Sequence, residues 1–480
     1  MSDISYVRDS MLPPSEPPGA QTGVVKWMRE NLFSGLSNTV LTLVGVAAIY
    51  YFLQLVLPWL LHGVWYANSL SECRSIIAEN YGPNASGACW AVIRLRWYQF
   101  VFGFYPPELW WRPTLNFALL FVALAPALFS DNLRMVRIMV GVVAALYLLA
   151  LVCLSTTPLI FVVTAVLIAA LFGVSVVAPM QLIWVTLLFP FITIYLLWGG
   201  SVWSSAMGLA GFGVLAVVYR LTNDRLGVVV ATGVGVVAAI LWWIFLAGPV
   251  AGGLASVLAF RLEPMDSDRF GGFLLAFVIG VSSISISLPI GILLALGRQS
   301  DMLLIRSLSI GFIEFVRGVP LITMLFTASL LLGYFLPPQT NFDLILRVVI
   351  LVTFFAAAYN AEVVRGGLAA LARGQYEAAD ALGLDYWQAQ RLIIMPQALK
   401  VAIPGIVTNF IGLFKDTTLV NFVGLRDPLI GITAVVRSDL DWKGIYWEPY
   451  IFVGGVFFLA CYGMSRYSMY LERKLKTDHR

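Results

Sequence analysis

The sequence predicts an all-α integral membrane protein with about twelve membrane-spanning helices, and three observations carry that prediction. Hydrophobic residues make up 60% of the 480 residues and charged residues 12%, with a mean hydropathy of +0.87. Soluble domains are roughly half apolar and a quarter charged. Apolar runs of about 20 residues also recur along the chain. The basic residues gather at the ends of these runs, where they set topology, so the net charge of +4 does not indicate nucleic-acid binding.

The first 33 residues are polar and include the run Pro-Pro-Ser-Glu-Pro-Pro at 13–18. They show no cleavable signal peptide, so we expect a cytoplasmic tail over 1–33 followed by an anchoring span. Lys26 and Arg29, ahead of Ser34, favour a short interfacial helix at the end of that tail.

Apolar windows long enough to span a bilayer predict the individual helices. They lie at 37–61, 113–130, 138–155, 227–248, 271–296, 308–335, 345–366, 400–422 and 450–470. The stretch 156–219 is almost continuously apolar, with three short breaks that contain Pro or Gly. Those breaks are consistent with turns or with tolerated kinks, so the windows leave the number of spans there open.

Basic residues help to count the spans, because they mark the helix ends that face the cytoplasm. The clusters are Lys26 and Arg29, Arg134 and Arg137, Arg220 and Arg225, Arg298 and Arg306, Arg365 through Lys400, and Arg473, Lys474 and Lys476. We place all of them inside with three spans over 138–219. We also predict a total of about twelve spans, with seven ahead of residue 263, five behind it, and both termini cytoplasmic.

The polar segment 63–112 falls outside on this scheme and contains Cys73 and Cys89. An oxidising compartment permits a disulfide between them, whereas two unpaired thiols are the alternative that spacing leaves open. Cys153 and Cys461 lie in apolar runs and are expected to be ordinary core residues.

The sequence offers no chemistry for a metal or a nucleotide. His62 and His479 lie far apart, without a cysteine or carboxylate cluster beside them. A phosphate loop ending in Gly-Lys-Ser or Gly-Lys-Thr does not occur. We therefore expect no cofactor and no catalytic residue in this chain.

A polar, helix-forming insert between two apolar spans is the most informative segment. Residues 371–382 are rich in alanine and charged helix formers, and Gly383 stands where a left-handed residue would end that helix. Asp385 with Gln388 then resembles a capping box that begins a second helix. Pro396 is expected to stop the second helix.

This helix-turn-helix has the features of a docking device for a soluble partner. Ala378 and Ala379 are small enough for a partner backbone to come close, and Glu377 can meet a basic residue or a helix N-terminus. A solvated amphipathic linker is the bland alternative.

The same residues carry a family resemblance. The series Glu377-Ala378-Ala379, Gly383, Ile393, Met395 and Pro396 resembles the EAA signature of ABC importer permeases, with Met395 in place of the usual leucine. Further blocks resemble the polar amino-acid branch of that family and cover 271 to about 425. They are Ile313 to Leu321, Ala361 to Leu368, Gly374 to Glu377, Pro396 to Leu399 and Phe414 to Leu419.

Within that branch, the long N-terminal extension is similar to the larger permease subunit of general L-amino-acid importers. Gly87-Ala88-Cys89-Trp90, and Tyr105-Pro106 ahead of Trp111-Arg112, carry this closer resemblance. The stretch 156–268 departs from the family pattern, and Asp268-Arg269-Phe270-Gly271-Gly272-Phe273 replaces a Trp-Gly-Gly-Leu-like start of the first core helix.

The resemblance implies a type I ABC importer transmembrane fold. Its five-helix core would occupy 263–480, with a coupling loop at 371–400, behind extra transmembrane helices at 34–262. The residues implied to couple the chain to an ATPase are Glu377, Ala378, Ala379, Gly383, Ile393 and Pro396. The implied partners are an ABC ATPase dimer that carries ATP and magnesium, a second homologous permease subunit, and a periplasmic amino-acid-binding protein. The implied cargo is an L-amino acid, and the implied location is the bacterial inner membrane.

Charged residues at membrane depth are costly and usually functional. Arg317 and Arg365 lie near predicted cytoplasmic helix ends, where snorkelling or pairing with Glu314 and Glu362 is expected. A second set lies well inside the fourth core helix and is a candidate substrate path. It comprises Lys415, Asp416, Thr417 and Thr418. Mutual neutralisation of Lys415 and Asp416 is the alternative. For Tyr359 and Asn360, interhelical bonding is as ordinary as a role in the path.

Three rival functions remain open at this point. An ion-coupled secondary transporter would use Lys415, Asp416 and Glu362 for coupling, but it predicts an internal repeat that we do not find. A membrane scaffold would not need the small residues and the glycine of the insert. The third is an ABC importer of a different small polar solute, which the sequence does not exclude because specificity would lie partly in the binding protein.

Overall fold

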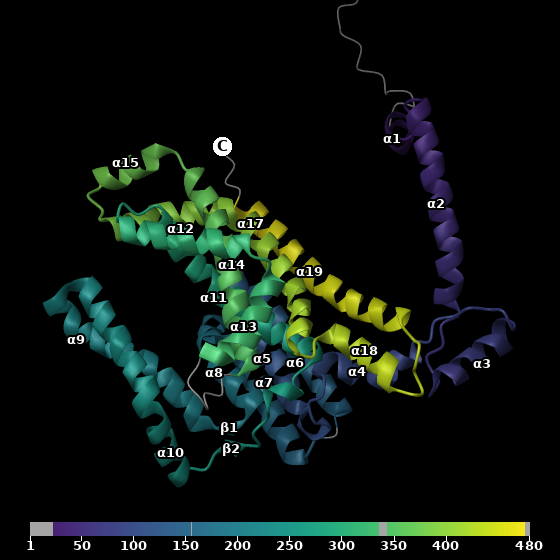
Figure 1. Cartoon of the computed structure of the whole chain (residues 1–480), viewed down its shortest axis with the longest axis horizontal. Helices are drawn as coiled ribbons and strands as arrows, with labels where there is room; N and C mark the ends of the chain where they lie inside the picture. Colours follow the sequence, from purple (N-terminus) through teal and green to yellow (C-terminus); the bar gives the residue numbers. More distant parts are fainter. Residues whose placement is uncertain (1–22, 155, 336–342, 476–480) are drawn as a thin grey trace, which may run out of the picture. The chain divides into compact units, whose positions relative to one another are not determined.

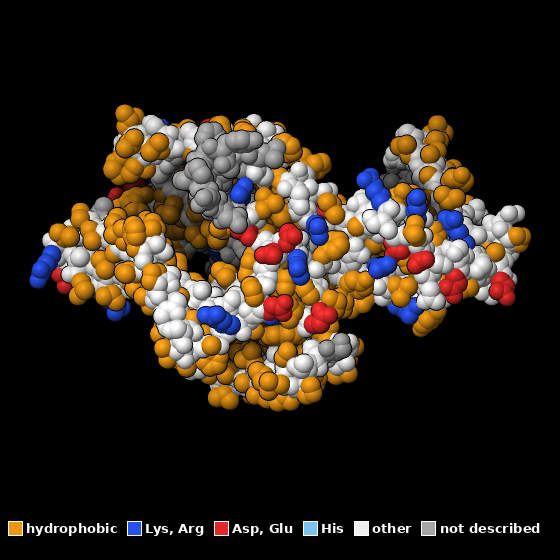
Figure 2. Space-filling model, turned by 60° about the horizontal axis from the view of Figure 1, so that its bottom comes forward, with side chains coloured by type: hydrophobic (Ala, Val, Ile, Leu, Met, Phe, Trp, Pro, Cys, Tyr) orange, Lys and Arg blue, Asp and Glu red, His pale blue; other side chains and the backbone are white. Residues whose placement is uncertain are grey.

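The computed structural model describes residues 23–154, 156–335 and 343–475, and these are largely helical (Figure 1). The chain forms two compact units, Met1–Leu95 and Arg96–Arg480. Hydrophobic side chains cover much of the visible surface, as expected for contact with lipid (Figure 2).

The first unit holds α1 (Gly23–Asn31), α2 (Leu36–Leu61), α3 (Leu70–Tyr81) and the start of α4 (Ala91–Phe102). α1 is amphipathic, and α2 is an apolar helix of 26 residues with no buried side chain. In the segment that follows α2 along the chain, Cys73 and Cys89 are joined by a disulfide with a Cα–Cα distance of 6.1 Å. This bond closes α3 onto the segment that leads into α4.

The second unit contains the remaining elements. Its first part comprises α5 (Trp111–Leu128), α6 (Leu133–Cys153), α7 (Pro158–Val177), α8 (Ile183–Trp198), β1 (Gly200–Ser201), α9 (Val202–Leu241), α10 (Ala247–Val257) and β2 (Arg261–Leu262). Its second part comprises α11 (Gly272–Arg298), α12 (Leu303–Gly318), α13 (Leu321–Phe335), α14 (Leu344–Ala369), α15 (Arg373–Ala381), α16 (Tyr386–Ala389), α17 (Met395–Asp416), α18 (Pro428–Ser438) and α19 (Trp447–Leu475).

The expectation of three spans over 138–219 was wrong, because α6, α7, α8 and the first half of α9 cross that stretch. Gly199 and Gly200 adopt positive φ angles of 71° and 82°, so the chain reverses between α8 and α9 within a few residues. Gly227 has a φ of 75° and divides α9 into two spans. The described residues then hold 11 candidate spans, or up to 12 if a bent helix pair counts as one. The predicted total of about twelve is confirmed.

That bent pair corrects the predicted single span 308–335. α12 and α13 meet at an angle of 101°. Val319 is extended between them, and Pro320 follows, so a straight helix through this point would lack a backbone donor and crowd the proline ring. The short helix α18 is an addition that the apolar windows missed, since its 11 residues fall below the length of a span.

The helices before residue 263 and those after it share one hydrophobic core. Phe102, Tyr105 and Leu197 pack in the same buried cluster as Leu274 of α11 and Val352 of α14. Backbones also approach closely here, because Gly272 has a φ of 58° and an added Cβ would overlap the carbonyl oxygen of Phe100. The extension from residue 96 onward is therefore an integral part of the fold.

Polar contacts join the same two parts at both ends. The Tyr467 hydroxyl of α19 donates to the Leu128 carbonyl at the end of α5, at 2.8 Å, and Lys474 pairs with Asp131 close by. At the opposite end, Arg96 pairs with Asp439, just beyond α18. α19 is thus tied to the extension helices as well as to α17.

Candidate functional site

The predicted docking insert lies between α14 and α17 and forms the helix-turn-helix that the sequence predicts (Figure 1). α15 ends in a Schellman motif: the Leu384 N–H donates to the Ala379 carbonyl at 3.3 Å, and the Gly383 N–H donates to the Asp380 carbonyl at 2.9 Å. Gly383 has a φ of +69°, which explains the need for glycine here. An L side chain at this position would be strained.

The turn into the second helix is held by a reciprocal capping box. The Gln388 N–H donates to the Asp385 side chain at 2.8 Å, and the Asp385 N–H donates to the Gln388 side chain at 3.1 Å. α15 and α16 therefore meet in a turn with specified geometry, as opposed to a flexible linker.

Pro396 does not stop the second helix, contrary to the prediction. The π-helix η6 (Gln390–Ile394) joins α16 to α17, and the Met395 N–H donates to the Gln390 carbonyl five residues back. In this widened turn the backbone hydrogen bonds just ahead of Pro396 run over five residues and not four. The helix can therefore continue where, in a regular α-helix, the proline ring would clash with the preceding turn. The insert is consequently continuous with the membrane-spanning helix α17.

Ala379 is not on an open approach face, since its side chain is only 1% exposed. Glu377 and Ala378 are exposed beside it. The larger exposed side chains of the same insert were not among the predicted contact residues. These are Leu382, Tyr386, Trp387 and Leu392, with Leu382 71% and Trp387 60% exposed. We call Leu382, Tyr386 and Trp387 the apolar knob.

Close backbone packing fixes the insert to the membrane helices. A Cβ added to Gly367 in α14 would overlap the carbonyl oxygen of Ala398 in α17, and one added to Gly405 would lie 2.6 Å from Val363. The Gln397 side chain donates to the Gln375 side chain of α15 at 2.8 Å. The two flanking helices and α15 therefore touch where the insert begins.

An apolar cluster continues this attachment. Ile394 and Leu368 are fully buried in it, and Ile393, Leu371 and Tyr376 pack against it as partly buried residues. Burial raises the pKa of the Tyr376 phenol, because the charged form loses its hydration. Ile393 thus has a packing role inside the chain.

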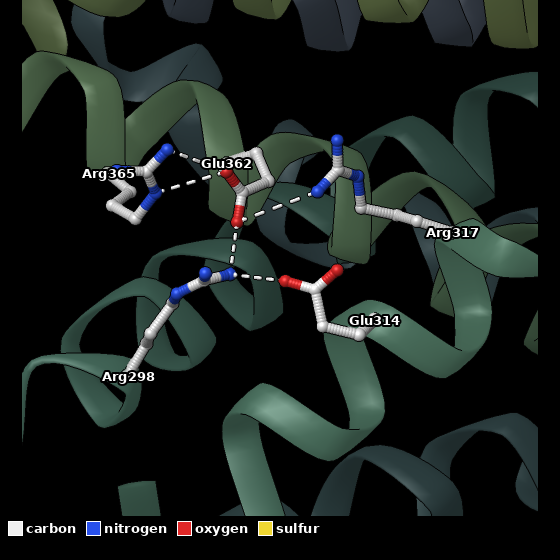
Figure 3. Close-up of polar contacts among 5 residues, drawn as sticks. All are labelled: Arg298, Glu314, Arg317, Glu362 and Arg365. Carbon is white, nitrogen blue, oxygen red and sulfur yellow. Dashed lines mark hydrogen bonds and ion pairs between the residues drawn. The ribbon is translucent and has the colours of Figure 1, made fainter.

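An ionic cluster joins the ends of α11, α12 and α14 close to the insert (Figure 3). Glu362 is its centre and accepts from Arg365 at 2.9 and 3.0 Å, from Arg298 at shorter range, and pairs with Arg317 at 3.7 Å. Arg298 also donates to Glu314 at 3.0 Å. We call these five residues the Glu362 cluster.

The cluster refines the pairing that the sequence predicts. Glu362 does pair with Arg317 and Arg365, but Glu314 pairs with Arg298, the last residue of α11. Arg298 had been assigned only a topological role, because its partners lie 16 and 64 residues away. Three guanidinium groups share two carboxylates, so the cluster carries a net charge of +1.

A buried polar chain crosses the core further along the same helices. The side chain of Asn360 is fully buried, donates to the Ser287 hydroxyl of α11 at 3.2 Å, and accepts from the Asn409 amide of α17 at 3.2 Å. Interhelical bonding, which the sequence offered as the ordinary alternative, is the role that the structure gives to Asn360.

The candidate substrate-path residues lie at the end of α17 and not deep within it. Lys415 and Asp416 are its last two residues, and no ion pair joins them within the described chain. Thr417 is fully buried, and its hydroxyl donates to the Phe414 carbonyl at 2.7 Å. Thr418 bonds in the same way to Lys415. The structure therefore does not gather these residues into one polar site.

The described residues contain no group of three or more His, Cys, Asp or Glu side chains placed to hold a metal ion. What the geometry offers is a shaped insert that continues into α17 through η6 and packs against α14. A bundle of many membrane spans that carries such an insert is typical of a membrane transport permease.

Comparisons with known proteins agree with this class. Residues 287–477 match the family described as binding-protein-dependent transport system inner membrane component. The chain is 61% identical, over the full length of both proteins, to the glutamate/glutamine/aspartate/asparagine transport system permease protein of Rhodobacter capsulatus. It is 34% identical to an inner membrane amino-acid ABC transporter permease protein of Escherichia coli, over 97% of this chain and 96% of that protein.

A crystal structure of an amino acid ABC transporter is also similar, at 27% identity and a TM-score of 0.38, over 42% of this chain and 91% of that one. On the strength of the two full-length relatives, the chain belongs to the amino-acid ABC transporter permeases. It is a transport subunit of an importer in the membrane.

Proposed function

We propose that this chain is the permease subunit of an ATP-driven, binding-protein-dependent importer of acidic amino acids and their amides. The observation that carries the substrate class is the 61% identity with the glutamate/glutamine/aspartate/asparagine permease, which covers both proteins from end to end. A match of that extent includes the extension helices and the outer segments, as well as the insert shared by more distant importers.

The insert is the proposed docking site for the ATPase. Its apolar knob exposes Leu382, Tyr386 and Trp387 together, and the two rings contact each other edge to face at 5.4 Å. Exposed aromatic side chains of this kind anchor protein interfaces when they enter an apolar groove. Glu377 and Ala378 would flank the contact, and Gly383 would set the turn. Ala379 and Ile393 would support the insert by packing inside the chain, and Pro396 by its place in the continuous helix.

The rigid attachment supplies the coupling. A movement of the insert must be passed to α14 and α17 together, because the backbones touch at Gly367 and the helix runs on without a break through η6. The Glu362 cluster links the end of α14 to α11 and α12, so those helices would follow. Closing of the ATPase dimer would then rock the bundle between inward- and outward-facing states.

The remaining partners follow from the same proposal. ATP and magnesium would bind to the separate ATPase, a second homologous permease would complete the path, and a periplasmic binding protein would deliver the amino acid. Both termini would be cytoplasmic in the inner membrane. Of the candidate path residues, exposed Lys415 is the one free to meet a substrate carboxylate, with Asp416 and Thr418 beside it and Thr417 inside the packing.

Uptake in proteoliposomes tests the proposal. We would reconstitute this chain with its partner permease, ATPase and binding protein, and measure entry of radiolabelled glutamate, glutamine, aspartate and asparagine with and without ATP. Trp387→Ala with Leu382→Ala should abolish ATP-dependent uptake, while Leu221→Ala, an exposed apolar residue of α9, serves as the matched control. Uptake by this chain alone under an ion gradient would establish the secondary-transporter alternative instead.

A further inference from the structure

The hairpin formed by α9 and α10 contains a slot that the chain does not fill. The cavity has a volume of about 770 Å³ and is lined by the first turns of α9, by α10, and by β1, β2 and the residues that follow β2. Its walls are made of small side chains from both helices. They include Ser204, Gly208, Gly248, Ala251, Gly252 and Ala255.

The glycines show that this space is open. A Cβ added at Gly248 or Gly252 would meet no atom within 4 Å. Elsewhere in the same hairpin, a Cβ at Gly211 would overlap the indole of Trp243, so there the two helices pack tightly. The α10 side of the slot carries only glycine and alanine, so we expect a lipid chain or another protein, and not water alone, to fill the space along it.

The mouth of the slot carries one cation and one anion. Arg261, in β2, and Glu263, directly after that strand, both line it. Both are exposed, and neither takes part in an ion pair within the described residues. Beside the mouth, Ser204 is exposed toward the same slot.

The backbone at the mouth is held in place. The buried side chain of Arg112 donates to the Glu263 carbonyl at 2.7 Å, and the Met265 N–H donates to the Trp198 carbonyl at 2.8 Å. A Cβ added to Gly199 would overlap the carbonyl oxygen of Glu263, so the two backbones are in direct contact. The two charges are therefore mounted on a fixed segment and not on a loose loop.

We propose that the slot is a binding site for a zwitterionic phospholipid with a primary ammonium headgroup, such as phosphatidylethanolamine. One acyl chain fills the space along Gly248 and Gly252, Arg261 donates to the phosphate, and Glu263 accepts from the ammonium group. The pair of opposite charges decides between occupants. A purely anionic headgroup would meet Glu263 unfavourably, and an apolar transmembrane helix would fill the space without using either charge.

Native mass spectrometry of the purified full chain, delipidated and then titrated with phosphatidylethanolamine or phosphatidylglycerol, tests this proposal. We expect one phosphatidylethanolamine to be retained preferentially. Arg261→Gln should weaken that binding about tenfold or more, as for loss of a charged hydrogen bond. Gly252→Leu should exclude the lipid by filling the slot. Arg261→Lys should retain it in part, and Arg225→Gln, at the other end of the hairpin, should leave it unchanged.

A second substitution tests the proposed contact between Glu263 and the ammonium group. Glu263→Gln should reduce the preference for phosphatidylethanolamine over phosphatidylglycerol, because the phosphate contact stays while the ammonium contact is lost. Equal binding of the two lipids by the native chain would overturn the proposal, as would unchanged binding in both Arg261→Gln and Gly252→Leu. Cross-linking of Ser204→Cys to another protein in the membrane, without a bound lipid, would show that a helix occupies the slot. Thermal unfolding of each variant separates loss of lipid from loss of fold.

Discussion

α14 and the first half of α9 are similarly apolar by composition, yet half of the apolar stretch of α14 is buried and only 6% of that of α9. The difference lies in what each helix can contact. α14 has Gly367 against a neighbouring backbone, and Asn360 within a polar chain across three helices. The first half of α9 contacts α10 and, through Phe212, Phe191 of α8, but most of its side chains stay partly or fully exposed. Hydropathy puts a helix in the membrane, whereas small and polar residues decide whether it joins the bundle.

The largest expected effect tests the close contact at the base of the insert. Gly367→Leu should destabilise the protein by about 3 kcal/mol or more, because the side chain must displace the backbone of α17. Gly233→Leu in α9 should change the melting temperature little, since a Cβ there meets nothing within 4 Å. Thermal unfolding in detergent measures both, and equal effects of the two substitutions would remove the distinction between bundle and hairpin.

A buried carboxyl of the bundle should make its stability depend on pH. Asp427 begins α18 with only 1% of its surface exposed, and burial raises its pKa to about 6, against the lowering effect of hydrogen bonds from the Ile430 and Leu429 N–H groups. A pKa raised in the folded state means that the folded protein binds the proton more tightly. Stability should therefore rise as pH falls from above 6 toward 4, by up to about 3 kcal/mol.

Melting temperatures at a series of pH values check this expectation, and Asp427→Asn should flatten the curve while keeping the helix cap. Asp131 supplies the contrast. Lys474 lowers the pKa of the exposed Asp131 carboxyl. The contribution of this carboxylate to the free energy of unfolding is therefore lost only at pH values below the ordinary pKa range of a carboxyl group. If Asp131→Asn flattened the curve between pH 4 and 6 and Asp427→Asn did not, the assignment would be wrong.

The Glu362 cluster should contribute less, because its side chains are partly open to solvent. Glu362→Gln removes the charge shared by three guanidinium groups and should cost about 1–2 kcal/mol, with the ATPase activity of the complex becoming less dependent on substrate. Glu314→Gln breaks one pair of a more exposed residue and should cost under about 1 kcal/mol. A larger effect of Glu314→Gln would show that Glu314 of α12, and not Glu362, contributes most to the stability of the cluster.

The smallest expected effect concerns the buried polar chain. Asn360→Ala should cost about 1 kcal/mol, since interhelical hydrogen bonds in membranes average about 0.6 kcal/mol each. A double-mutant cycle with Asn409→Ala isolates the bond between α14 and α17. Additive effects would show that this contact does not hold the two helices together.

Local patterns predicted the docking insert well, because its turn depends on residues a few positions apart. The capping box of Asp385 and Gln388, and the positive φ of Gly383, are properties of short segments. Two features of the same insert were missed for a physical reason. Pro396 continues a helix because a π-turn precedes it, and Ala379 is hidden because α15 folds back on its neighbours. Neither is visible without the arrangement of the chain.

The helices before residue 263 likewise combine features that local sequence predicts with features that depend on the tertiary arrangement. Apolar windows located most of its spans, but the number over 138–219 depended on how tightly Gly199 and Gly200 let the chain reverse. Arg298 could be seen as a marker of topology and not as a partner of Glu362, because ion pairs between helices join residues far apart in sequence. Comparison of side chains within one predicted helix cannot reveal such pairs.

By itself, the sequence determined that this protein crosses the membrane many times, that its docking insert turns at Gly383, and that it resembles an importer permease. Those properties follow from hydropathy and from hydrogen bonds between near neighbours. The tertiary structure alone decided which helices bury their surfaces, which charges meet at Glu362, and where a slot stays open between α9 and α10. These depend on packing between distant segments, which local composition does not encode.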